Sequence, residues 1–305
     1  MGYSLPDFRN GTESLEEANA TGNGTHSKDR HQSFSSFENT IFLVYVVISL
    51  LGLVGNGIVI WLLGFRIKKN PFSVYILNLA YADFIFSFCN CIFYTLHLLA
   101  YKVFVLTALL AAVIRSSFLV DLCLLIAIST ERCVAVLCPL WYRCHRPKHL
   151  SSILCALIWG LAFCMAILLY LVTYLELLSI NKVYLVYYII CLLTFLVLCV
   201  SSLTLLMHVQ CGSRRRQTTR LYKTILLNVL TFLLLGLPFG IGLLTYSLLP
   251  EEALYRPFVA RISILFSILN SLVNPVIYFF VGRHRQTPGW KPLREVLWSA
   301  LTDDT

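Results

Sequence analysis

The stretch IFLVYVVISLLGLVGNGIVIWLLGF, residues 41–65, is almost entirely apolar and contains no charged side chain. A helix needs about 20 such residues to cross the hydrocarbon core of a bilayer. Six further apolar runs follow it, at residues 72–99, 103–137, 150–175, 183–209, 221–249 and 255–281. The chain is therefore predicted to be an all-α membrane protein whose seven transmembrane helices form one bundle, because the loops that join them are short.

Charge is distributed in a way that orients this bundle. Charged residues make up only 13% of the chain and hydrophobic residues 58%, whereas a soluble domain is about one quarter charged. Cytoplasmic loops retain the Lys/Arg excess. One side of the predicted bundle carries Arg66, Lys68, Lys69, Arg143, Arg146, Lys148, Arg214, Arg215, Arg216, Arg220, Lys223, Arg283, Arg285, Lys291 and Arg294, and the other carries only Lys102, Lys182 and Arg256. The net charge of +9 thus indicates topology and attraction to anionic membrane lipids, and no nucleic-acid partner is expected.

The two ends of the chain complete the predicted organisation. Residues 1–36 are polar, lack a cleavable signal peptide and contain glycosylation sequons at Asn10, Asn19 and Asn23, so we expect a disordered extracellular tail. Residues 37–282 form the seven-helix domain. Residues 283–305 form a cytoplasmic tail in which Leu293, Val296, Leu297, Ala300 and Leu301 recur at helical spacing. This pattern predicts a short amphipathic helix on the inner leaflet of the plasma membrane.

The eleven cysteines show no pattern of metal or redox chemistry. They are Cys89, Cys91, Cys123, Cys133, Cys138, Cys144, Cys155, Cys164, Cys191, Cys199 and Cys211, and none falls in a predicted outer loop. We interpret them as small apolar packing residues rather than zinc ligands or disulfides.

A few polar side chains lie inside the predicted spans, where each is costly unless it has a partner. Asp83 lies in the second span, Asp121 in the third, and Asn270, Ser271 and Asn274 in the seventh. Two bare carboxylates in one low-dielectric bundle would repel each other. We therefore predict one coupled polar site that holds a sodium ion or a shared proton, and no other cofactor. The alternative is that Asp121 has its own backbone or water partner.

Arg132 ends the third span on the same helical face as Asp121, about 16 Å away along the axis. Its neighbour Glu131 is acidic, and an ion pair at the inner edge of the membrane can hold a closed state. The alternative is an ordinary charge pair at the interface.

Prolines interrupt two of the spans, Pro238 in the sixth and Pro275 in the seventh. Each removes one backbone hydrogen bond and frees a carbonyl. A single proline of this kind is compatible with a static kink. Both prolines together, with the buried acids and Glu131-Arg132, are typical of a bundle that switches between two packings.

Several motifs resemble those of rhodopsin-class receptors, and specifically of the Mas-related family. The class motifs are Gly55-Asn56, Leu79-Ala80-Tyr81-Ala82-Asp83 and Asn274-Pro275-Val276-Ile277-Tyr278. The subfamily motifs are Ser129-Thr130-Glu131-Arg132-Cys133, Pro139-Leu140-Trp141-Tyr142-Arg143-Cys144-His145-Arg146-Pro147, Cys211-Gly212-Ser213-Arg214 and Gly236-Leu237-Pro238-Phe239-Gly240-Ile241. The resemblance covers residues 41–301, and Gly236 stands where most of the class carries a tryptophan.

This resemblance implies coupling to heterotrimeric G proteins of the q or i class, with Arg132 and Leu140 meeting the G-protein helix. The residues assigned to coupling and switching are Glu131, Arg132, Leu140, Phe232, Pro238, Asn274, Pro275 and Tyr278. The chain departs from its relatives at the outer end, where it lacks their cysteine pair and has Thr173 at an aligned pocket position.

The predicted ligand pocket contains Arg115, Thr173, Glu176 and Arg261. Basic residues around its mouth, Arg115, Lys102, Lys182, Arg256 and Arg261, outnumber Glu176, Glu251 and Glu252. This balance favours anionic or neutral amphipathic extracellular ligands. Two alternatives are that Arg115 pairs permanently with Glu176 and that Arg261 extends to the membrane surface.

A signalling receptor explains the topology, sequons and prolines together. The alternatives are a receptor-like protein that binds ligand with little signalling, and an ion transporter or channel, although the chain lacks an internal repeat. An intramembrane aspartyl protease would need a catalytic motif around Asp83 and Asp121, which is missing. No enzyme activity is expected.

Overall fold

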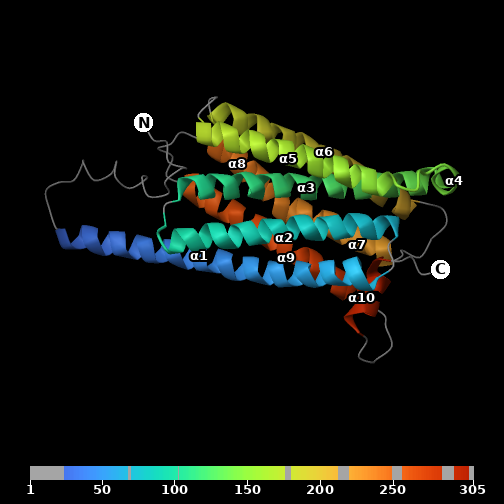
Figure 1. The fold of residues 1–305 in the computed structure, drawn as a ribbon, viewed down its shortest axis with the longest axis horizontal. Coiled ribbons are helices and arrows are strands. Elements are labelled where there is room, and N and C mark those ends of the chain that lie inside the picture. The colour runs from blue at the N-terminus through green and yellow to red at the C-terminus, as the bar shows by residue number, and fades with distance from the viewer. Residues whose placement is uncertain are drawn as a thin grey trace.

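A computed structural model describes residues 24–67, 70–101, 103–175, 180–211, 220–248, 256–283 and 292–301. Within these residues the chain is helical (Figure 1). The elements are α1 (Gly24–Trp61), the π-helical turn η2 (Leu62–Arg66), α2 (Pro71–Leu98), α3 (Phe104–Leu137), α4 (Pro139–Cys144), α5 (Leu150–Leu175), α6 (Ile180–Cys211), α7 (Arg220–Thr231), the π-helical turn η3 (Phe232–Gly236), α8 (Leu237–Leu248), α9 (Arg256–Arg283) and α10 (Leu293–Leu301).

Within the described residues, seven helical segments are long and apolar enough to cross a membrane, which confirms the predicted fold class. They are Phe37–Arg66, Pro71–Leu98, Phe104–Ala135, Leu150–Tyr174, Leu185–Thr204, Thr224–Gly242 and Pro257–Val281. The helices run side by side, and α4 and α10 lie at one end of the bundle, here called the α4 end (Figure 1). The opposite end contains the turn at Leu99–Tyr101.

The first helix begins earlier than the first apolar run. The structure places residues 24–36 in α1, where the sequence suggested a disordered tail. Extending a helix that is already formed adds one hydrogen bond per residue fixed, so polar residues can continue it. The sequons at Asn10, Asn19 and Asn23 lie outside the described residues.

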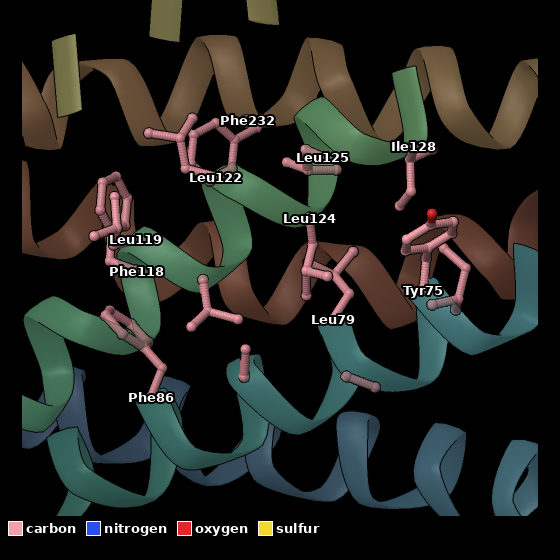
Figure 2. Packing of buried hydrophobic residues seen from close by; sticks show 14 of the residues in the cluster. Tyr75, Leu79, Phe86, Phe118, Leu119, Leu122, Leu124, Leu125, Ile128 and Phe232 are labelled. Carbon is pink, nitrogen blue, oxygen red and sulfur yellow. The ribbon is translucent and has the colours of Figure 1, made fainter. Parts of the chain in front are cut away.

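The core lies along α3, which packs against α2, α5 and α6. Figure 2 shows Leu122 and Phe118 of α3 beside Phe232, while Leu124 faces Leu79 of α2. The Phe118 and Phe232 rings stack with centroids 5.5 Å apart. Large apolar side chains on the outer faces remain exposed, among them Leu161, Phe163, Val200, Leu234 and Phe280, as expected of a surface that meets lipid tails.

The carbonyl freed by Pro275 has an acceptor role that links two distant spans. The backbone nitrogen of Pro275 cannot donate to the carbonyl four residues earlier, at Ser271. Asn56 Nδ2 donates to this Ser271 oxygen at 3.0 Å. Glycine at position 55 allows the close approach, because a Cβ there would lie 3.3 Å from the Pro275 ring. The first and seventh spans are therefore joined by a buried polar bond.

The predicted irregularity in the sixth span takes the form of a π-helical turn. Pro238 would clash with the carbonyl of Leu234 in a regular α-helix. The turn η3 (Phe232–Gly236) lies directly before Leu237-Pro238 and widens the helix there. Such turns occur frequently at functional sites.

The short C-terminal helix is present as α10. Val296, Leu297 and Ala300 are buried, and the helix packs against α7 and α9. Thr224 Oγ1 donates to the Ala300 carbonyl at 3.0 Å, which satisfies one of the last carbonyls of the helix. The apolar face of α10 thus contacts the bundle, while Leu293 and Trp298 are exposed.

The described cysteines form no disulfide. Cys89, Cys155 and Cys191 are buried and agree with the interpretation as packing residues. That interpretation does not fit Cys138, Cys144 and Cys164, which are exposed, and Cys211 is among the residues whose side chains are not described.

Candidate functional site

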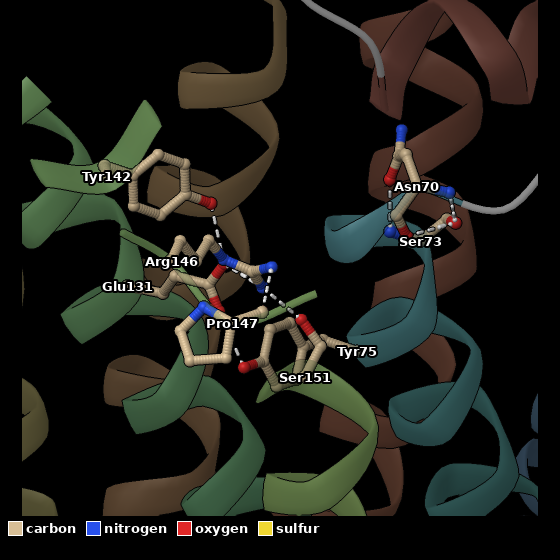
Figure 3. Close-up of polar contacts among 8 residues, drawn as sticks. All are labelled: Asn70, Ser73, Tyr75, Glu131, Tyr142, Arg146, Pro147 and Ser151. Atoms are coloured by element: carbon tan, nitrogen blue, oxygen red, sulfur yellow. Dashed lines mark hydrogen bonds and ion pairs between the residues drawn. The ribbon is translucent and has the colours of Figure 1, made fainter. Parts of the chain in front are cut away.

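Glu131, near the end of α3, is the centre of a polar cluster at the α4 end. Its carboxylate accepts hydrogen bonds from the Tyr75 hydroxyl of α2 at 2.7 Å and from the Tyr142 hydroxyl of α4 at 2.7 Å. Arg146 donates through Nε at 2.8 Å and forms an ion pair through Nη2 at 2.6 Å. Arg146 Nη2 also reaches Ser151 Oγ at 2.5 Å. Figure 3 shows Tyr75, Tyr142 and Arg146 directed toward Glu131, with Ser151 beside Arg146.

The expected pairing of Glu131 with Arg132 is not what the structure shows. The Arg132 guanidinium instead lies over the Phe72 ring, 4.9 Å from its centroid. Adjacent residues of a helix point in directions about 100° apart, so they do not face each other. The loop residue Arg146 reaches Glu131 from outside the helix. Glu131 is therefore held by Tyr75 and by the segment after α3, and Arg132 is not part of this cluster.

Tyr142 keeps its role as a hydrogen-bond donor over the whole physiological range. Burial, together with the hydrogen bond to the Glu131 carboxylate, raises the pKa of Tyr142 to about 12. Because this folded-state pKa lies above the ordinary value near 10, the contribution of the hydroxyl to stability is complete below pH 10 and is lost as the pH rises through 12.

Arg146→Ala is expected to destabilise the folded receptor. The side chains of Arg146 and Glu131 are only 8% and 11% exposed, and breaking such a buried pair costs about 3–5 kcal/mol in other proteins. The thermal unfolding midpoint of the purified protein should fall by several degrees. Lys148→Ala, which removes an exposed charge from the same loop, is the matched control and should have little effect. Equal midpoints for the two variants would contradict the importance of the pair.

The other predicted coupling residues are distributed between the α4 end and the bundle interior. Leu140 of α4 is 79% exposed. Tyr278 and Phe232 are each 1% exposed. Asn228 Nδ2 donates to the Tyr278 hydroxyl at 3.3 Å and links the sixth span to the seventh.

The predicted polar core is brought together around Asp83. Asn274 Nδ2 donates to Asp83 Oδ2 at 2.7 Å, and Ser271 Oγ donates to the Asp83 carbonyl at 3.1 Å. Asp121 is 2% exposed and interacts electrostatically with Asp83. Asn270 is equally buried. The sodium ion or shared proton predicted for this site stays a prediction.

Arg261, at the opposite end of the bundle, has an acidic partner that sequence reasoning missed. It forms an ion pair with Glu38 of α1, and its backbone carbonyl accepts a hydrogen bond from the Tyr45 hydroxyl at 2.7 Å. The alternative in which Arg261 extends to the surface is wrong, since its side chain is only 12% exposed. Glu38 was overlooked because it precedes the apolar run at residue 41, although the first span begins at Phe37.

Two further pocket residues contact their own helices. Arg115 Nη1 donates to the Ala111 carbonyl at 2.9 Å, and the Arg115 carbonyl accepts from the Tyr187 hydroxyl at 2.7 Å. Thr173 Oγ1 donates to the Leu169 carbonyl at 2.7 Å. Glu176 lies outside the described residues, so the pairing of Arg115 with Glu176 stays a prediction.

Sequence reasoning also missed the partners that hold the predicted residues in place. Tyr75, Tyr142 and Asn228 each bond a predicted site residue from another helix. Their signal in the sequence is a hydroxyl or amide within or beside an apolar run, which does not identify the partner.

Comparison with known proteins identifies the family. Residues 55–278 match the family model described as 7 transmembrane receptor (rhodopsin family). The chain is 41% identical to mouse Mas-related G-protein coupled receptor member A6, over 90% of this chain and 94% of that protein. It is 43% identical to rat member A, with coverages of 89% and 92%, and 44% identical to human member X1, with coverages of 84% and 81%. These relatives are receptors rather than enzymes, and the chain belongs to the Mas-related G-protein-coupled receptors of the rhodopsin family.

Proposed function

We propose that this receptor sits in the plasma membrane with its N-terminus outside the cell and activates heterotrimeric G proteins of the q or i class at the α4 end. The basic residues of the loops at that end support this orientation. The observation that carries the proposal is the pairing at the end of α3. Arg146 and two tyrosines hold Glu131, while Arg132 and the exposed Leu140 lie at the same end of the bundle.

Nucleotide exchange on purified heterotrimers tests the G-protein class. Receptor in phospholipid nanodiscs is mixed with q-, i-, s- or 12-class heterotrimers, and basal exchange is measured against empty nanodiscs. We expect acceleration with q or i heterotrimers. Acceleration of s heterotrimers alone would refute the class assignment, and no acceleration with any heterotrimer, with or without agonist, would favour the receptor-like protein that does not signal.

We propose that the extracellular ligand is anionic or neutral and amphipathic. The Arg261–Glu38 pair removes one cation from the predicted mouth of the pocket. Arg115, Lys102, Lys182 and Arg256 still exceed Glu176, Glu251 and Glu252 by one. Polycationic ligands would find no acidic excess at this end of the bundle.

Arg115→Ala is expected to abolish the response to an anionic agonist while surface expression is kept, because an ion pair in a low-dielectric site contributes far more than one in water. Agonists are found by an unbiased screen that records calcium release and cAMP. Arg261→Ala serves as the control, since the charge of Arg261 is already matched by Glu38.

A permanent Arg115–Glu176 pair would give a different pattern. Arg115→Ala and Glu176→Ala would then each lower surface expression, and the double variant would partly recover it. Polycationic agonists that are insensitive to both substitutions would refute the charge argument.

A further inference from the structure

The last described helix, α10, packs its apolar face against the bundle instead of presenting it to lipid. Val296, Leu297 and Ala300 are 7%, 0% and 0% exposed. Residues three and four apart share one face of a helix, so these side chains form a single stripe. α10 packs against α9 and α7 at the α4 end (Figure 1). The face that an amphipathic helix would use on a membrane is therefore covered by the receptor itself.

The contact with α7, the part of the sixth span before the η3 turn, includes a buried hydrogen bond. Thr224 Oγ1 donates to the Ala300 carbonyl at 3.0 Å, and Thr224 is 0% exposed. One helical turn further along α7, Asn228 Nδ2 donates to the Tyr278 hydroxyl of α9 at 3.3 Å. Thr224 and Asn228 lie on the same face because they are four residues apart. One face of α7 is thus bonded to both α10 and α9.

Apolar packing reinforces these bonds. Ile225 and Val229 of α7 are 1% and 2% exposed. They belong to the same buried core as Leu297 and Ala300, so this core continues from the bundle into α10. Closely packed side chains leave no room for a helix to shift without losing contacts. Movement of α7 away from α9 therefore breaks the contacts of α10 with at least one of the two helices.

The sixth span is irregular directly beyond these contacts. The η3 turn and Pro238 interrupt the regular hydrogen bonding between α7 and α8. A helix interrupted in this way changes its angle more easily than an unbroken one. The contacts of α7 with α9 and α10 consequently fix the position of the half of the span that is able to swing.

We propose that α10 is an autoinhibitory helix, which holds α7 against α9 in a packing that does not activate G proteins. This inference rests on the proposed function, because it places the G protein at the same end of the bundle. In this packing Glu131 is held by Tyr75, Tyr142 and Arg146, and Tyr278 is 1% exposed. Activation then requires α10 to lose its contacts with α7. A partner that binds only the released arrangement shifts the population toward it.

Basal nucleotide exchange tests the inhibition without any agonist. Full-length receptor in phospholipid nanodiscs is mixed with q- or i-class heterotrimers. Leu297→Asp places a charge at a fully buried position and should raise the exchange rate at least about fivefold over the wild type. Thr224→Val removes the hydroxyl at nearly constant volume and should raise it about threefold, since one hydrogen bond corresponds to a factor of about 2–12. Leu293→Asp, the same charge at a 53% exposed position of α10, should match the wild type.

Amide hydrogen exchange on the same samples reports whether α10 has left the bundle. In Leu297→Asp the backbone amides of residues 296–301 should exchange faster than in the wild type, while those of α2 and α3 stay protected. The double variant Leu297→Asp/Arg132→Ala should return nucleotide exchange to the level of Arg132→Ala alone. That result would show that the gain passes through the proposed G-protein surface. Thr224→Val decides the test if Leu297→Asp yields no folded receptor.

Three results would overturn the autoinhibitory role and leave the proposed function intact, provided that the wild type accelerates exchange over empty nanodiscs. Faster amide exchange in α10 with an unchanged basal rate would make the contact purely structural. A basal rate below that of the wild type would show that α10 supports coupling. Unchanged amide exchange in Leu297→Asp would show that α10 is not seated on α7. If no receptor, wild type or variant, accelerates any heterotrimer, the proposed function itself fails and this inference falls with it.

Discussion

Arg132→Ala is expected to abolish productive G-protein activation while the receptor still reaches the cell surface. In this structure the Arg132 side chain lies over Phe72 and forms no ion pair with Glu131, so its removal should not unfold the helix end. Coupling between a receptor's two binding sites is typically about 1–3 kcal/mol, a factor of 5–150. We expect agonist-stimulated nucleotide exchange to fall by at least about tenfold, measured on purified heterotrimers at equal receptor density.

Leu140→Asp should produce a similar loss, because a charged side chain would replace the exposed apolar contact on α4. Leu293→Asp is the matched control. Leu293 of α10 is 53% exposed at the same end of the bundle, yet it belongs to a different surface. Full activation by Arg132→Ala and Leu140→Asp receptors at normal surface density would refute the assignment of this end to G-protein binding.

Gly242→Ala is expected to destabilise the packing of α8 against α9. A Cβ at position 242 of α8 would lie 1.7 Å from Ser263 Oγ and 2.7 Å from Ser263 Cβ of α9. Rotation of the serine removes the first clash but not the second, so the two helices must separate. Overpacking of this kind costs about 1–3 kcal/mol and occasionally more. The yield of folded receptor and its thermal midpoint should both fall clearly.

A second substitution at Ser263 should relieve this clash. Adding Ser263→Gly to Gly242→Ala should restore the midpoint, whereas adding Ser263→Ala should not, because the Cβ of residue 263 remains. Gly240→Ala is the matched control in the same helix, since a Cβ there would meet nothing within 4 Å. If Gly242→Ala is as stable as Gly240→Ala, the close contact between α8 and α9 is not as the structure has it.

The fold followed from the sequence because hydropathy over about 20 residues is a local property, and the partners of polar groups did not because they are not local. Pro275 predicts a freed carbonyl from its own chemistry. Its donor, Asn56, lies 215 residues before Ser271 in the chain, and no spacing rule connects them. For Glu131, a partner close in sequence was predicted and was wrong. The adjacent base Arg132 points away from Glu131 because neighbouring residues of a helix face different directions, and Arg146 forms the ion pair instead.

The charge balance of the outer pocket was also hard to predict, because it depends on ion pairs between residues far apart in the sequence. A count of charges at the mouth treats each side chain as independent, whereas Glu38 and Arg261 cancel across the first and seventh spans. The Glu38–Arg261 pair was not predicted because the start of the first span was placed too late in the sequence. Its apolar run begins at residue 41, but the span includes Phe37 and Glu38, because a helix can present a charged residue inward when an arginine meets it.

The bond between Asn56 and the Ser271 carbonyl joins the first span to the seventh one turn before Pro275. The seventh span cannot straighten or bend further at Pro275 without losing this bond, and the Glu38–Arg261 pair fastens the same two helices near their other end. We therefore expect the first and seventh spans to move as one body. Rearrangement on activation then falls to the sixth span, which already contains a widened turn, and labels that report distance should detect movement of α7 relative to α1 but none of α9 relative to α1.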